Sequence, residues 1–91
     1  MKNVIRLIAL SVGIMATGTA FAGADCTSEP KEKWMPQNEM QKKILELGYT
    51  IERFKIDGNC YEIYGRTVDS KKVEAYFNPV TGEVVKQEIE S

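Results

Sequence analysis

The sequence predicts an α+β fold in which one N-terminal helix packs on a three- to four-stranded antiparallel β-meander. Two observations support this class. Apolar residues recur at helical spacing in residues 36–47, and after Gly48 they alternate with polar residues instead. Turn residues then separate short alternating segments at regular intervals, which is typical of consecutive hairpin strands.

The helix is predicted over "PQNEMQKKILEL" (36–47). Met40, Ile44 and Leu47 are spaced i, i+4, i+7 and form one apolar stripe. Pro36 suits the first turn, where its missing N–H is not needed, and Gly48 suits the left-handed residue that follows a helix. We therefore expect the stripe to cover one face of the sheet.

Strands are predicted at "YTIERFKI" (49–56), "CYEIYGRTV" (60–68), "KVEAYF" (72–77) and "EVVKQEI" (83–89). Ile51 and Phe54 are out of phase for a regular strand, and a bulge near Glu52 and Arg53 would place both in the core. Alternation places the next core residues on one face: Tyr61, Ile63, Gly65, Val73, Ala75 and Phe77. The last strand lies at a sheet edge and could accept an added strand, although its charges oppose this.

Residues 1–22 are predicted to be a signal peptide for export. Lys2 and Arg6 precede the apolar run "LIALSVGIMA", and Ala20-Phe21-Ala22 fits the small-x-small cleavage pattern. Cleavage after Ala24 fits the same rule. The apolar run is too short to cross a bilayer, so no membrane span is expected after cleavage. We expect a periplasmic or secreted bacterial protein, with residues 23–33 as a tether and 34–91 as the folded domain.

Charge narrows the choice of partner. Removing residues 1–22 takes two of the 12 basic and none of the 13 acidic residues, which leaves a net charge of −3. A mildly acidic chain argues against nucleic acid or an anionic membrane surface as partner. A protein partner is therefore expected, and the chain itself is expected to be a monomer or a weak dimer.

The two cysteines, Cys26 and Cys60, both lie in the exported part, and we expect them to form a disulfide. They are 34 positions apart, so a bridge would close a long loop and add roughly 3–4 kcal/mol of stability at most. That gain matters because a chain of this size has a marginal core. A reactive or metal-binding thiol pair is the alternative, but the chain has no CxxC spacing and no histidine.

The segment "LGYTIERFKIDGNCYEIYGRTVDSKKVEAYFNPVTGEVVK" resembles the PepSY-like domains, in particular the small exported single-domain group. The resemblance extends over about residues 34–89, and Asn78 stands where the family turn usually begins with Asp. It implies a helix on an antiparallel sheet and a location outside the cytoplasm. Similar domains occur in propeptides of thermolysin-type metalloproteases, where they are thought to inhibit or chaperone the enzyme. The resemblance supplies no catalytic motif.

The sheet face away from the helix is the candidate partner surface. Tyrosine and arginine often anchor interfaces, and this face is expected to carry Arg53, Lys55, Glu62, Tyr64, Arg66, Glu74 and Tyr76. Glu62 and Glu74 form a possible carboxylate pair, but on a solvated face beside Arg53 and Lys55 cross-strand ion pairs are the simpler interpretation. Stabilisation of the sheet alone remains an alternative role for the whole patch.

Without histidine the chain offers no Ser-His or Cys-His dyad, and it has no glycine-rich phosphate loop. We therefore expect no enzyme, no cofactor and no metal site. Two functions remain open. The first is a binding or regulatory module that inhibits or chaperones a protease or envelope partner. The second is a structural or accessory envelope protein without a dedicated client.

Overall fold

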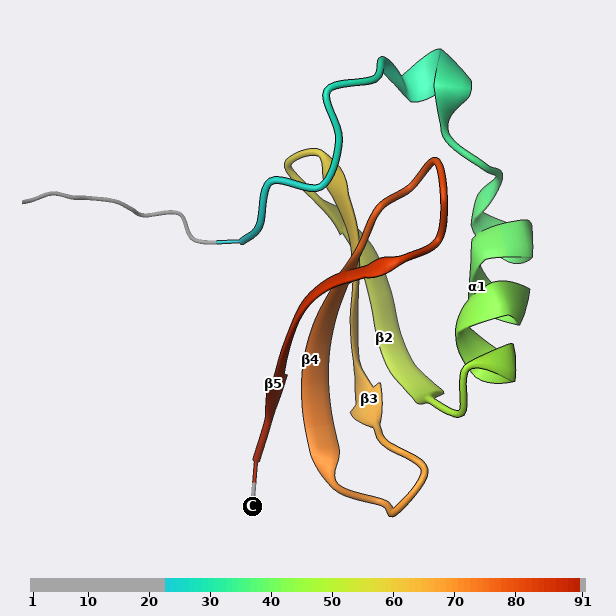
Figure 1. The fold of residues 1–91 in the computed structure, drawn as a ribbon. Helices are drawn as coiled ribbons and strands as arrows, with labels where there is room; N and C mark the ends of the chain where they lie inside the picture. The colour runs from blue at the N-terminus through green and yellow to red at the C-terminus, as the bar shows by residue number, and fades with distance from the viewer. Residues whose placement is uncertain (1–22, 91) are drawn as a thin grey trace, which may run out of the picture.

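The computed structural model describes residues 23–90, so the predicted signal peptide lies outside the described part of the chain. One helix, α1 (Gln37–Glu46), packs on a four-stranded antiparallel sheet with the order β2-β3-β4-β5 (Figure 1). The strands are β2 (Thr50–Asp57), β3 (Cys60–Arg66), β4 (Lys72–Phe77) and β5 (Val84–Ile89). Strands that follow one another in the sequence also pair with one another in the sheet, which confirms the predicted α+β meander.

The helix does not stand at the N-terminus, as the prediction placed it. Residues 23–30 come first, followed by a short 3-10 helix, η3 (Lys31–Lys33). Neither η3 nor α1 reaches the length and apolarity that a membrane-crossing helix needs; this applies to residues 23–90 alone. Pro36 lies just before α1 in an extended conformation, where its missing N–H costs nothing.

The apolar stripe of α1 is shorter than predicted. Met40 and Ile44 are completely buried, but Leu47 is 54% exposed, and so is Leu45. Leu47 lies just past the last helical residue, where the chain turns at Gly48 (φ 102°) toward β2. Tyr49 fills the core at this end instead, because its ring packs edge-on against Phe77 at 5.7 Å.

The predicted bulge in the first strand is present. The register of β2 against β3 shifts between Ile51 and Arg53, and both Ile51 and Phe54 contact the core as a result. Gly65 lies opposite Ile51 at this point. A side chain there would collide with the carbonyl oxygen of Thr50, so the close approach of the two strands requires glycine.

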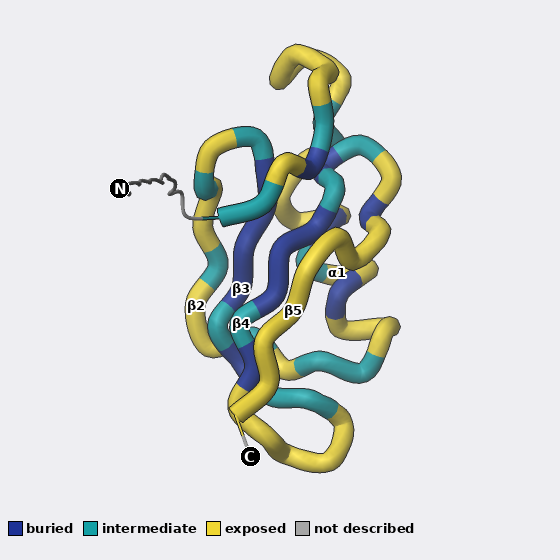
Figure 2. The backbone as a smooth tube through the Cα atoms, turned by 60° about the vertical axis from the view of Figure 1, so that its left-hand side comes forward, coloured by how far each residue is buried: buried dark blue, intermediate teal, exposed yellow. Residues whose placement is uncertain are grey.

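The core lies between α1 and the sheet, mainly over β3 and β4 (Figure 2). Its buried residues are Met40, Ile44, Tyr61, Ile63, Val73, Ala75 and Phe77. Most residues of the edge strand β2 are exposed, and all residues of the edge strand β5 are exposed. The predicted core face is therefore confirmed for β3 and β4.

Candidate functional site: the sheet face opposite the helix

The sheet face opposite α1 is divided into a covered half and an open half. The covered half lies under residues 23–29, which we call the strap. Cys26 of the strap is disulfide-bonded to Cys60 at the start of β3. Both cysteines are buried with Tyr76, and Ala24 packs against them. The lone strand cysteine is thus a structural anchor, and no described cysteine is free.

Asn59 is a second anchor for the strap. Its Oδ1 accepts a hydrogen bond from the Cys26 backbone N–H at 2.9 Å, and its Nδ2 donates to Asp25 Oδ1 at 2.8 Å. In the sequence, Asn59 stands out only by its place between the first two predicted strands. No local signal could have shown its second role, because its strap partners are more than 30 positions away.

Beside Tyr76 lies an unexpected buried carboxyl group. The sequence analysis placed Glu62 on a solvated face, but its side chain is only 1% exposed. Lys55 Nζ approaches Glu62 Oε1 at 3.8 Å, too far for a hydrogen bond, and no described donor satisfies either Glu62 oxygen. Tyr76, the partner of Glu62 in the register of β3 and β4, is itself buried and helps to exclude water from this side of the face. The expectation of a solvated face is therefore wrong at Glu62, whereas the expected cross-strand ion pair is present, with Lys55 as the partner.

The carboxyl groups of Glu62 on β3 and Glu74 on β4 influence each other's pKa. Burial, together with a hydrogen bond to Glu74, raises the pKa of Glu62 to about 7. A hydrogen bond from Glu62 and one from the Tyr76 hydroxyl lower the pKa of Glu74. The Tyr76 hydroxyl donates to Glu74 Oε2 at 2.6 Å. As the pH falls, Glu62 thus takes up its proton before Glu74 does.

This pair predicts a pH dependence of stability. A carboxyl group whose pKa is raised by folding holds its proton more tightly in the folded state. Its stabilising contribution is present below about pH 4.5 and is lost as the pH rises to about 7. Glu62→Gln removes the ionisation, so the variant should exceed the wild type in unfolding free energy at pH 8, by up to roughly 3 kcal/mol. At pH 4.5 the two should be nearly equal.

Urea unfolding at the two pH values measures this difference. The matched control is Glu39→Gln, which removes a carboxylate from the exposed surface of α1. This variant should show the same change in unfolding free energy between pH 4.5 and pH 8 as the wild type. A Glu62→Gln variant that is less stable than the wild type at pH 8 would show that Glu62 is charged and favourably paired there.

The open half is centred on Tyr64 in β3. Arg53 lies over the Tyr64 ring, with Cζ 5.4 Å from the centroid, and Lys55 Nζ lies 5.8 Å from it. Arg66 pairs with Glu52 at 3.2 Å across the strands. These side chains remain at least partly exposed. Five of the seven predicted surface residues therefore stay together in the open half: Arg53, Lys55, Tyr64, Arg66 and the partly buried Glu74.

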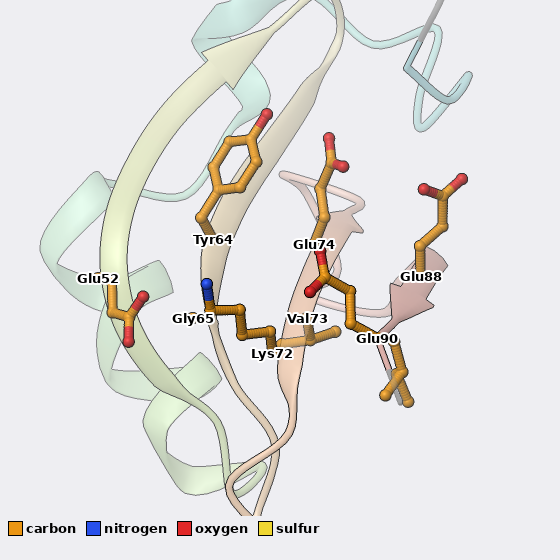
Figure 3. Close-up of a pocket in the computed structure, with 9 residues that line it drawn as sticks. Glu52, Tyr64, Gly65, Lys72, Val73, Glu74, Glu88 and Glu90 are labelled. Atoms are coloured by element: carbon orange, nitrogen blue, oxygen red, sulfur yellow. The ribbon is translucent and has the colours of Figure 1, made fainter.

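A shallow hollow of about 430 Å³ borders Tyr64 toward β5 (Figure 3). Four carboxylates line it, from Glu52, Glu74, Glu88 and Glu90, and Lys72 is the one lysine among its lining residues. The hollow shows no arrangement for metal binding, since residues 23–90 contain no group of three side chains able to hold a metal ion. Basic residues at Tyr64 thus adjoin an acidic hollow, so this half carries charge of both signs.

Comparison with known families agrees with this architecture. The family described as "peptidase propeptide and YPEB domain" matches residues 5–88. The chain belongs to this family, the PepSY-like domains. The match covers α1 and nearly all of the sheet of this PepSY-like domain. Comparison with curated proteins and with solved structures gave no match.

Proposed function

We propose that this PepSY-like domain is a non-catalytic, exported regulatory module that binds a peptidase or another envelope protein through the open half of its sheet. Tyr64, held between Arg53 and Lys55, is the observation that carries the proposal. An aromatic ring with flanking cations on a rigid strand pair is typical of interface anchors. Membership of a peptidase propeptide family favours a peptidase as the partner.

Export is part of the same proposal. The predicted signal sequence, a disulfide and the family all favour the periplasm or the exterior of the cell. Ala24 packs against the disulfide and Tyr76, so cleavage after Ala22 would keep a contact that cleavage after Ala24 would remove. We therefore favour Gly23 as the first residue of the exported chain.

The test is inhibition of a thermolysin-type metallopeptidase exported by the same cell. The oxidised chain beginning at Gly23 is titrated against the enzyme, and peptide hydrolysis is followed. The wild type should inhibit, and Arg53→Ala/Tyr64→Ala should weaken inhibition by roughly tenfold or more, because it removes an aromatic anchor and its cation.

Lys42→Ala on the exposed surface of α1 is the matched control and should inhibit like the wild type. Equal weakening by the two substitutions would place the interface elsewhere. A chain that neither inhibits nor binds exported peptidases would instead favour an accessory envelope role without a client.

A further inference from the structure

The outer edge of β5 is open along its whole length. β5 is the last strand of the sheet, and all six of its residues are exposed. The Glu90 N–H bonds to the Lys72 carbonyl of β4 at 2.9 Å. Because backbone groups alternate in direction along a strand, those of Gln87 and Ile89 point away from β4. An edge with free N–H and C=O groups is a template for a further strand.

We propose that two copies of this chain pair antiparallel along β5, with Gln87 opposite Gln87, and form one continuous sheet. The inference is independent of the proposed peptidase binding, which uses β2 and β3. The two edge strands, β2 and β5, each carry one register shift, at Glu52 and at Val85, so the choice of β5 rests on the order of its charges.

The order of charges selects the register. A two-fold axis perpendicular to the sheet relates the two β5 strands and leaves the same face of both copies on one side of the joined sheet. Each residue is therefore opposed by a residue whose side chain points to the same face. If the two-fold axis lay at Lys86, this lysine would face Lys86 of the other copy. If it lay at Glu88, this glutamate would face Glu88 of the other copy. Centring on Gln87 opposes Lys86 to Glu88 twice, within the regular part of β5 that follows its register shift at Val85. This self-complementarity indicates a second copy of the chain as the partner.

The surroundings of Glu88 favour the same contact. Glu88 lies directly opposite Glu74 of β4, so two carboxylates face each other within one chain. Lys86 of the same strand reaches Glu88 at 3.5 Å, but both side chains are largely exposed and free to change partners. A second Lys86, supplied by the other copy, would add positive charge beside this acidic pair.

Apolar surface at the same edge would also be covered. Val85 and Ile89 are each more than 40% exposed, and Ile89 shares a shallow hollow with Leu47 and Val68, which are exposed as well. Strand pairing would bring β5 of the other copy alongside Ile89 and so cover part of this surface. The pairing therefore combines backbone hydrogen bonds, two symmetric ion pairs and apolar contact.

Sedimentation equilibrium of the oxidised chain, in low salt at pH 7, tests the proposal over a concentration series. The wild type should dimerise reversibly. Lys86→Glu and Glu88→Lys should each raise the dissociation constant by roughly tenfold, since either change sets like charges opposite each other twice. The double variant Lys86→Glu/Glu88→Lys restores opposite charges and should recover dimerisation close to that of the wild type.

Circular dichroism should show the same fold for all four proteins, because both side chains are exposed. A wild type that stays monomeric up to about millimolar concentration, where weak pairing is measurable, would overturn the proposal. A dimer that is insensitive to either single substitution, or a double variant that fails to recover, would overturn the β5 register. Peptidase inhibition is measured separately on the same variants and should be unchanged.

Discussion

Ile44→Asp is expected to unfold the domain. Ile44 is completely buried on the α1 face that covers the sheet, within a core of only seven buried residues. The substitution removes core packing and places a carboxylate where no cation is available to it. The combined cost of several kcal/mol is comparable with the whole stability of a small domain. Far-UV circular dichroism at 25 °C should show loss of the folded spectrum.

Leu45→Asp is the matched control for this prediction. It introduces the same charge one residue along the same helix, but the Leu45 side chain is 54% exposed. The variant should fold and should differ from the wild type in unfolding free energy by less than about 1 kcal/mol. Similar melting temperatures for Ile44→Asp and Leu45→Asp would mean that α1 presents a different face to the sheet.

Reduction of the Cys26–Cys60 disulfide should lower the unfolding free energy by roughly 2–4 kcal/mol. The bridge closes a loop of 34 positions, and it also holds the strap over Tyr76. Without the bridge, the strap is held by the contacts of Asn59 with Cys26 and Asp25 and by the packing of Ala24. Guanidinium unfolding with and without reductant measures the difference.

The serine variants distinguish a structural bridge from a working thiol. Cys26→Ser, Cys60→Ser and the double variant should be destabilised to a similar extent, since each removes the same cross-link. The oxidised wild type should show no titratable thiol, folded or unfolded. If Cys26→Ser kept wild-type stability while Cys60→Ser lost it, the loss would come from packing at Cys60 and not from the bridge.

Sequence patterns predicted most of the fold because the side-chain alternation of each strand decides which of its residues face the core. Alternation in β3 and β4 assigned the core face, and the phase conflict between Ile51 and Phe54 revealed the bulge. Leu47 was assigned to the core by spacing alone, but spacing does not say where a helix ends or that Tyr49 fills that place. Periodicity therefore identifies a face more reliably than it identifies the residues at the end of an element.

The candidate site was harder to predict because the strap comes from a distant part of the chain. Alternation correctly placed Glu62 and Tyr76 on the face away from α1, and that face seemed open to solvent. Residues 23–29 cross this face and pack on Tyr76, which is buried, and Glu62 opposite Tyr76 is buried as well. The cysteine pair was the one feature of the sequence that indicated such a crossing.

Amide chemical-shift mapping of the labelled, oxidised chain during titration with an inhibited exported metallopeptidase tests the proposed binding surface most directly. We expect the largest changes in β2 and β3 around Arg53, Lys55 and Tyr64, with α1 unaffected. Changes concentrated in α1, or no changes at a saturating concentration of the peptidase, would contradict the proposal that the open half of the sheet binds the partner.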